Sequence, residues 1–196
     1  MARVGVLALQ GDYEAHAKAV QRAGGEAVEI RTAAGLDSVD GLILPGGEST
    51  TMLKLLKEEN LFEPLKRFGQ QKPIFGTCAG VILLASDVES PKQDSLALLD
   101  LTVERNGYGR QLDSHIARIP AEGVGELEAV FIRAPIIRRL GQAVRVLASH
   151  RGDPVLVEQG RHMAATFHPE LTSDPRIHAR FLSKLNANTL RPGVSP

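Results

Sequence analysis

Residues 73–85 read PIFGTCAGVILLA, and this stretch does most to decide which fold the sequence adopts. The apolar residues before Gly76 are typical of a buried strand, and those after Gly80 are typical of an apolar helix. The two glycines permit a tight turn between strand and helix, with Cys78 at its centre. This pattern predicts a nucleophile elbow in which cysteine replaces serine. Free N–H groups at the start of the helix would favour the thiolate of Cys78.

Short apolar runs alternate with segments of helical spacing through the first half of the chain. The runs are bounded by glycine or proline, as expected for strands buried on both faces, and they are Val4 to Leu9, Ala27 to Ile30, Gly41 to Leu44 and Pro73 to Phe75. Helical spacing follows the first run at Ala15, Ala19 and Val20. This β-α alternation predicts an α/β protein, a three-layer sandwich with a mainly parallel central sheet.

The second half of the chain has a different pattern. Its apolar runs follow one another with little helix between them, which predicts additional antiparallel or edge strands at Leu98 to Val103, Ile116 to Ile119, Ala129 to Ile132, Val144 to Leu147 and Val155 to Val157. After Thr172 a helix is expected, with Asp174 as its cap. We expect one domain over residues 1–187 and a flexible tail over residues 188–196, which carries little that could be buried.

Composition narrows the class of protein. The chain has 196 residues, 43% hydrophobic and 23% charged, which fits one globular domain. Lys plus Arg and Asp plus Glu each total 23, so no net positive charge favours nucleic acid or a membrane surface as partner. No long apolar run or signal-peptide pattern occurs, and we therefore expect a cytoplasmic protein. The single cysteine, Cys78, excludes an internal disulfide and a zinc site built on several thiolates.

A thiol nucleophile needs a base, and one of the six histidines has a suitable setting. His168 follows an apolar run, so we expect it at a strand end. Rigid Pro169 can hold an extended turn that brings Glu170 back to the imidazole, where the carboxylate would orient the ring. Taken alone, this tripeptide better fits a surface histidine beside a solvated glutamate. Together with the cysteine elbow, it predicts a Cys78–His168–Glu170 triad, and the other histidines have no comparable arrangement: His16, His115, His150, His162 and His178.

A glycine pair follows the third apolar run, in the sequence LILPGGESTT of residues 42–51. A strand again leads through a turn into a helix, so the N–H of Gly47 could supply half of an oxyanion hole. In the structural alternative, Gly46 and Gly47 only turn the chain and Ser49 caps the helix. No Gly-Lys-Ser/Thr follows, and no complete dinucleotide fingerprint occurs elsewhere, so we expect no nucleotide site.

These three features, in this order, resemble a class I glutamine amidotransferase. More narrowly, the chain is similar to the glutaminase subunits of pyridoxal 5'-phosphate synthase. The motifs that carry the resemblance span nearly the whole chain, and they are LQG at 9–11, LPGGESTTM at 44–52, GTCAG at 76–80, ERN at 104–106, GRQ at 109–111, FIRAP at 131–135 and FHPELT at 167–172. One departure is His115, where many relatives would carry an aromatic residue.

The resemblance implies a flavodoxin-like class I glutamine amidotransferase fold and hydrolysis of L-glutamine to L-glutamate and ammonia through a γ-glutamyl thioester. It implies catalytic roles for Cys78, His168 and Glu170. Glutamine contacts are implied at Gly47, Glu48, Ser49, Arg105, Ile132 and Arg133. Backbone N–H groups at Gly47 and Ala79 would form the oxyanion hole.

The resemblance also implies a partner. Ammonia would pass to the pyridoxal 5'-phosphate synthase subunit, a barrel enzyme, within a hetero-oligomer, and this chain would need no cofactor and no metal. We expect that docking could flip the flexible Gly46–Gly47 peptide beside Gln10, at the active-site edge of the sheet, and so complete the oxyanion hole.

Two other functions stay open from the residues alone. The elbow would equally serve a cysteine peptidase or a redox-responsive hydrolase, which a comparison of glutamine with peptide substrates would distinguish. A non-catalytic interaction subunit could keep the fold after losing the reaction, although all three residue types of the triad are present. The sequence leaves open the stoichiometry of an assembly, the docking surface and the separate roles of Arg105 and Arg133.

Overall fold

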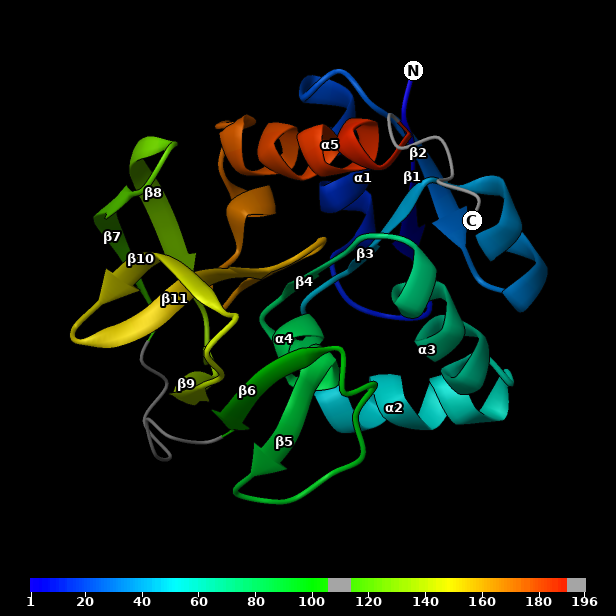
Figure 1. Ribbon diagram of the computed structural model, residues 1–196, viewed down its shortest axis with the longest axis horizontal. Helices are drawn as coiled ribbons and strands as arrows, with labels where there is room; N and C mark the ends of the chain where they lie inside the picture. Colours follow the sequence, from blue (N-terminus) through cyan, green and yellow to red (C-terminus); the bar gives the residue numbers. More distant parts are fainter. Residues whose placement is uncertain (106–113, 190–196) are drawn as a thin grey trace, which may run out of the picture.

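A seven-stranded sheet forms the middle layer of the molecule within the residues that the structure describes (Figure 1). The computed structural model describes residues 1–105 and 114–189. In sheet order the strands are β10 (Arg145–His150), β11 (Asp153–Gln159), β12 (His162–Ala165), β4 (Ile74–Thr77), β3 (Gly41–Leu44), β1 (Arg3–Leu7) and β2 (Glu26–Ile30). From β12 to β2 all neighbours are parallel, whereas β11 and β10 pair antiparallel. The mainly parallel sheet is therefore confirmed.

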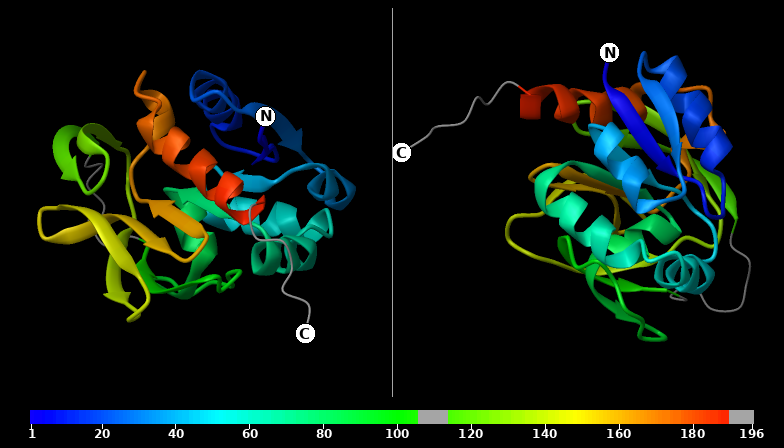
Figure 2. Two further views of the ribbon diagram at one scale, coloured as in Figure 1. Left: turned by 45° about the horizontal axis from the view of Figure 1, so that its top comes forward. Right: turned by 90° about the vertical axis from the view of Figure 1, so that its right-hand side faces the viewer.

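Helices cover both faces of this sheet (Figures 1 and 2). One face carries α1 (Tyr13–Arg22) and α5 (Arg176–Thr189), and the other carries α2 (Ser49–Glu58), α3 (Phe62–Gln71) and α4 (Ala79–Leu84). A short 3-10 helix, η1 (Ala33–Ser38), connects β2 to β3. Strand residues alternate between two cores: Ile43 packs with α1 and α5, whereas Leu42 and Leu44 pack with the other helices. This alternation explains why the strands read as continuous apolar runs.

Smaller strands flank the central sheet. β5 (Ala85–Glu89), β6 (Leu99–Glu104) and β9 (Ile136–Leu140) form a three-stranded sheet, and β7 (His115–Ala121) pairs with β8 (Gly125–Phe131) in a hairpin. The additional strands expected in the second half are confirmed by β6, β7, β8, β10 and β11. The sequence pattern did not predict β5, whose first residue, Ala85, ends an apolar run that continues the helix pattern. It did not predict β9 either.

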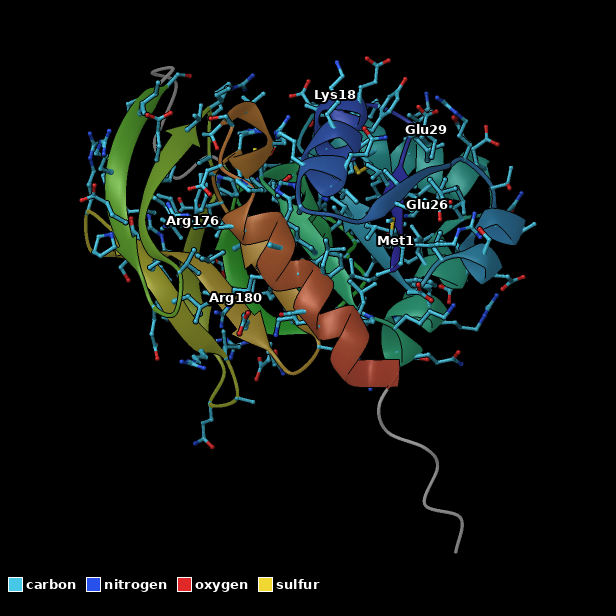
Figure 3. The ribbon with its side chains drawn as sticks, turned by 90° about the horizontal axis from the view of Figure 1, so that it is seen from above. Met1, Lys18, Glu26, Glu29, Arg176 and Arg180 are labelled. Atoms are coloured by element: carbon cyan, nitrogen blue, oxygen red, sulfur yellow. The ribbon has the colours of Figure 1, made fainter. Side chains whose placement is uncertain are left out.

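Helix α5 contacts both the β7–β8 hairpin and β11 of the central sheet. Arg176 donates to the carbonyl oxygens of Val124 at 2.8 Å and Glu126 at 2.7 Å. Arg180 forms an ion pair with Glu158 on β11 at 2.7 Å. In Figure 3 both arginines lie on the side of α5 that faces the green and yellow strands.

The start and the end of α5 bear on two further expectations. At its start, the carboxylate of Asp174 accepts from the Arg176 N–H at 3.0 Å, as expected of a cap. At its end, the helix reaches Thr189, whereas residues 190–196 lie outside the described part of the chain. The division into a domain over 1–187 and a tail over 188–196 stays a prediction. Within residues 1–105 and 114–189, no helix has the length and apolar character that crossing a membrane requires.

Candidate active site

Cys78 occupies the turn between β4 and α4 in a strained backbone conformation. Its φ of 47° and ψ of −105° are unfavourable for an L-residue, which typically costs about 1–3 kcal/mol. A Cβ on Gly80 would lie 2.2 Å from the Leu44 carbonyl oxygen, so only glycine permits helix and strand to approach this closely. The N–H of Cys78 donates to the Ala165 carbonyl at 2.9 Å, which ties the turn to β12. The predicted strand-turn-helix geometry is confirmed.

His168 and Glu170 lie beside Cys78 in the interior, with exposed fractions of 7% for Cys78, 4% for His168 and 4% for Glu170. The Nδ1–H of His168 donates to Glu170 Oε1 at 2.7 Å. The backbone N–H of His168 donates to the Val130 carbonyl at 2.8 Å, which fixes the residue against β8. The connecting turn is a 3-10 helix, η2 (Pro169–Leu171), rather than the expected extended turn. Proline suits this first helical position, where no N–H is needed.

The contacts of His168 favour its protonated form. Burial lowers the pKa of this imidazole, but hydrogen bonds with the Cys78 and Glu170 side chains, and the charges of both, outweigh burial and raise the pKa to about 10. A protonated imidazole beside a thiolate is the arrangement that activates cysteine nucleophiles. Glu170, on the opposite side of the ring, stabilises the imidazolium through Nδ1–H.

The glycine loop between β3 and α2 forms another wall of the site. A Cβ on Gly46 would lie 2.5 Å from His168 Cε1 and 3.3 Å from Cys78 Cβ, so this residue touches both members of the pair. Gln10 covers the next residue: its Oε1 accepts from the Glu48 N–H at 3.3 Å, and a Cβ on Gly47 would lie 2.3 Å from its Nε2. Gly47 also has a φ of 142°, and the loop therefore requires glycine at both positions.

Glu48 caps helix α2 and carries a fixed negative charge. Its carboxylate accepts from the N–H groups of Thr50 at 3.2 Å and Thr51 at 2.7 Å, and from both hydroxyls. Burial raises the pKa of this carboxyl, but those hydrogen bonds outweigh burial and lower it to about 2. Arg105 lies 3.5 Å from Glu48 Oε1, and its buried Nε has no hydrogen-bond partner among the described residues. An unpaired buried donor of this kind is available to a ligand.

The other predicted glutamine-binding residues lie in different surroundings. The carbonyl oxygen of Ile132 lies 3.8 Å from Cys78 Sγ. Arg133 follows it, is exposed and has a φ of 47°. Ser49 is buried as the first residue of α2 and donates to Gln93 Oε1 at 3.0 Å, so Glu48 rather than Ser49 is the helix cap. Their contacts with glutamine stay predictions.

A family model matches residues 6–187, a range that includes every residue of this site, and its description is the SNO glutamine amidotransferase family. The chain belongs to the SNO glutamine amidotransferase family. Two relatives of this glutamine amidotransferase cover almost its whole length, and both are called pyridoxal 5'-phosphate synthase subunit PdxT. The one from Solibacter usitatus is 59% identical over 192 residues, covering 94% of this chain and 100% of the relative. The one from Thermotoga neapolitana is 51% identical over 183 residues, covering 92% and 97%.

Solved structures agree with this assignment. A crystal structure described as a glutamine amidotransferase superposes with a TM-score of 0.89 at 47% identity, covering 93% of this chain and 98% of that one. A structure of PurLQS from Thermotoga maritima has a TM-score of 0.64 at 18% identity, covering 97% of this chain and 98% of that one, and shows the fold alone. The expected class I glutamine amidotransferase fold is therefore confirmed.

Polar residues that had no predicted role also lie beside the predicted triad residues of this glutamine amidotransferase. His16 Nε2 lies 3.3 Å from Glu170 Oε2 and 3.0 Å from the hydroxyl of Thr77. The sequence does indicate that His16 is buried, because it shares one face of α1 with the apolar residues Ala19 and Val20.

Asp12 is the second such residue. It is exposed, and its carboxylate lies within 4.8 Å of a His168 nitrogen and a Glu170 oxygen. These three residue types can bind a metal, but His168 and Glu170 already bond each other.

His115, at the position where an aromatic residue was expected, packs against an aromatic ring. Its ring stacks on Phe131, with centroids 4.8 Å apart and an interplanar angle of 14°. His150 stacks on the same phenylalanine with centroids 5.0 Å apart, and the two Nε2 atoms lie 3.0 Å apart. His115 thus packs as an aromatic residue in this family member.

Proposed function

We propose that the chain hydrolyses L-glutamine with Cys78 as nucleophile, His168 as proton carrier and Glu170 as the group that orients His168. The observation that carries this proposal is the burial of the three side chains in one contact chain, with His168 bonded on both sides. Family membership supports the reaction class, and the two PdxT relatives carry the name of a pyridoxal 5'-phosphate synthase subunit.

The reaction begins when Cys78 Sγ attacks the side-chain carbonyl carbon of glutamine. The C–N bond of the tetrahedral intermediate then breaks, His168 gives its proton to the departing nitrogen, and ammonia leaves a γ-glutamyl thioester behind. The neutral His168 next takes a proton from water, whose oxygen attacks the thioester carbon. Cleavage of the C–S bond releases L-glutamate and restores the thiolate and the imidazolium.

Backbone N–H groups of Gly47 and Ala79 would bind the negative oxygen of both intermediates. Ala79 is the first residue of α4, and Gly47 lies in the loop beside Cys78, so both belong to segments that touch the nucleophile. Losing one such donor typically costs about 3 kcal/mol in the transition state.

Glutamine recognition would use both charges and backbone groups. The guanidinium of Arg105, with its unpaired Nε, or that of Arg133 would take the α-carboxylate, because a guanidinium fork matches two carboxylate oxygens. The backbone around Glu48, Ser49 and Ile132 would frame the substrate. The fixed charge of Glu48 would serve mainly to hold Arg105 and the start of α2 in place.

We further propose that the ammonia is used on a second chain in the cytoplasm. Free ammonia is mostly protonated near neutral pH and is then a poor nucleophile, so delivery through a protein interface avoids wasting glutamine. The partner would be a pyridoxal 5'-phosphate synthase subunit built as a barrel, in a hetero-oligomer. Its docking would release the contact of Gln10 with Glu48 and let the Gly46–Gly47 peptide flip, so that the oxyanion hole is completed.

Glutamate release tests this function directly. We expect the chain to form glutamate and ammonia from glutamine, with a higher turnover when the synthase subunit is added, and we expect no cleavage of peptide substrates. The Cys78→Ala variant should retain the fold and lose the activity by far more than tenfold, since it lacks the only covalent catalyst. Turnover of this variant within tenfold of the parent, or preferential peptide cleavage, would refute the proposal.

A further inference from the structure

A fully buried histidine lies behind the triad. His16 is 0% exposed, and its ring lies between Thr77 at the end of β4, Glu170 in η2 and His178 on α5. Figure 3 looks down on α1 and α5, which lie side by side. Burying a polar ring costs free energy unless its nitrogens are bonded, so the partners of His16 indicate what the ring does there.

Both nitrogens of His16 have close polar neighbours. Nδ1 lies 3.0 Å from His178 Nε2. Nε2 lies 3.0 Å from Thr77 Oγ1 and 3.3 Å from Glu170 Oε2. Glu170 Oε1 is already the acceptor for His168. The carboxylate of Glu170 therefore has one imidazole beside each oxygen. Oε2 is buried and forms no hydrogen bond within the described residues, and His16 Nε2 lies 3.3 Å from it.

His16 and His178 are both neutral at neutral pH. Burial, followed by the nearby rings of His178 and His168, holds the pKa of His16 well below its usual value. Burial and the charge of Arg22 lower the pKa of His178 to about 4. A neutral imidazole carries a single N–H, so the position of that proton decides whether His16 attracts or repels Glu170.

The neighbours favour one tautomer. With the proton on Nδ1, His16 would turn the lone pair of Nε2 toward a buried carboxylate oxygen. His178 would then carry its own proton on Nδ1, which has no partner among the described residues, and orphaned buried N–H groups are rare. With the proton on Nε2, His16 faces Glu170 and Thr77 with a donor, while His178 donates from Nε2 to His16 Nδ1. Only with the proton on Nε2 does every close contact of His16 join a hydrogen-bond donor to an acceptor.

We propose that His16 is a positioning residue that holds Glu170 in place for His168. Its Nε2–H supports Oε2 of the carboxylate, and His178 keeps the proton on that nitrogen by donating to Nδ1. The inference rests on the proposed function, because it assigns a support to the triad of the same reaction. Without the donor, Glu170 Oε2 is unsupported and the carboxylate can rotate away from His168, which weakens the imidazolium and with it the thiolate.

The single cysteine makes a direct test possible, because iodoacetamide alkylation of the native full chain reports Cys78 alone. The groups that face His168 are Cys78, Glu170 and Asp12. Those that face His16 are His178, His168, Glu170 and Thr77. We expect His16→Met to raise the midpoint of the alkylation rate against pH by about one unit and to lower kcat about tenfold. KM for glutamine should change little, since His16 lies away from the substrate.

Two further variants separate positioning from packing. His16→Gln places an amide donor near the position of Nε2 and should restore most of the midpoint and of kcat. His162→Met, the same substitution at a buried histidine that accepts from the Ile74 N–H at 3.1 Å, should lower stability without moving the midpoint. In a Glu170→Gln background, His16→Met should add less than a twofold change, because its effect passes through Glu170. An unchanged midpoint in His16→Met, or equal shifts in His16→Met and His162→Met, would overturn the inference.

The tautomer gives an independent readout that does not need a variant to fold. Nitrogen-15 NMR of the labelled wild-type chain at neutral pH should show His16 neutral and protonated at Nε2. Protonation at Nδ1, or an imidazolium, would contradict the assignment. If the wild type hydrolysed no glutamine but the midpoint and tautomer behaved as expected, the proposed function would fail and the positioning role would stand. If hydrolysis were normal but the midpoint and the tautomer both differed from expectation, the positioning role of His16 would fail and the proposed function would stand.

Discussion

At the scale of single residues, contacts with Cys78 and Glu170 raise the pKa of His168. Burial lowers the pKa of His168, but the hydrogen bond with Cys78, then that with Glu170, and then the charges of both outweigh burial and raise the pKa to about 10. We therefore expect Cys78→Ala to lower the pKa of His168 by at least about one unit. An NMR titration of the His168 ring protons in both proteins measures this change. An identical titration curve in the variant would mean that Cys78 does not form the ion pair.

Glu170 and His168 differ in what their loss removes. In the proposed mechanism, His168→Asn removes the proton carrier, whereas Glu170→Gln removes only the group that orients it and supplies its countercharge. We expect both variants to lower kcat, with the larger loss in His168→Asn. Steady-state glutamine hydrolysis by equally folded variants tests this order, and a larger loss in Glu170→Gln would show the roles to be assigned the wrong way round.

The residues around this pair also show which parts of the site can be predicted from the sequence. Cys78, His168 and Glu170 were predictable because each stands beside a local signal, a glycine-flanked turn or a proline. His16 and Asp12 were not, because their proximity to Glu170 depends on how α1 lies on the sheet rather than on their sequence neighbours. The 3-10 geometry of η2 was missed for a related reason, since proline fits both an extended turn and a first helical position.

At the scale of elements, the contact between α4 and β3 depends on Gly80. A Cβ there would lie 2.2 Å from the Leu44 carbonyl oxygen, and backbone cannot move aside cheaply. We expect Gly80→Ala to lower the free energy of unfolding by more than about 2 kcal/mol and to impair glutamine hydrolysis, because α4 must move and Cys78 precedes it.

Gly24 supplies the matched control for that substitution. It has a φ of 87°, and a methyl group added there would have no atom within 4 Å, so Gly24→Ala should cost only about 1 kcal/mol of conformational strain. Glutamine hydrolysis should be unchanged. Urea denaturation and turnover of both variants provide the comparison, and equal losses would show that the α4–β3 contact is not the sensitive one.

Strands differ in how readily their sequences reveal them. β1, β3 and β4 are buried on both faces and read as apolar runs, so their parallel pairing was predictable. The expectation of burial on both faces was wrong for β2, an edge strand on which Glu26 and Glu29 are exposed and only Ile30 is buried. β5 reads ASDVE, in which Ser86, Asp87 and Glu89 are exposed, and its pairing with β6 has a register shift between Ala85 and Asp87. It also begins directly where α4 ends, so no two-residue alternation marks it in the sequence. β9 reads IIRRL and carries its two arginines on an exposed stretch, and its conformation depends on pairing with β6 and on contacts with β11 rather than on a sequence pattern.

At the scale of the whole molecule, buried neutral histidines make stability sensitive to mild acid. Burial lowers the pKa of His162 and of His178 to about 4 in the fold, below the usual value of 6.5. The unfolded chain then binds more protons between pH 6.5 and 4, so the folded state loses stability as the pH falls through this window. Each of the two histidines should contribute up to about 1.4 kcal/mol per pH unit.

Urea denaturation at pH 7 and pH 5 measures this dependence. The His162→Gln variant, which cannot be protonated in this range, should show a smaller difference between the two pH values than the wild type by on the order of 1–2 kcal/mol. The same difference in both proteins would indicate that carboxyl groups rather than His162 cause the loss.

The contact between His16 and His178 joins residues 162 positions apart. A ribosome delivers α1 among the first elements and α5 as the last described one, with Glu170 shortly before it. A nascent chain can therefore place Cys78 in its elbow while the groups that charge and orient His168 have not yet been made. We therefore expect glutamine hydrolysis to begin only after α5 has been made and has docked.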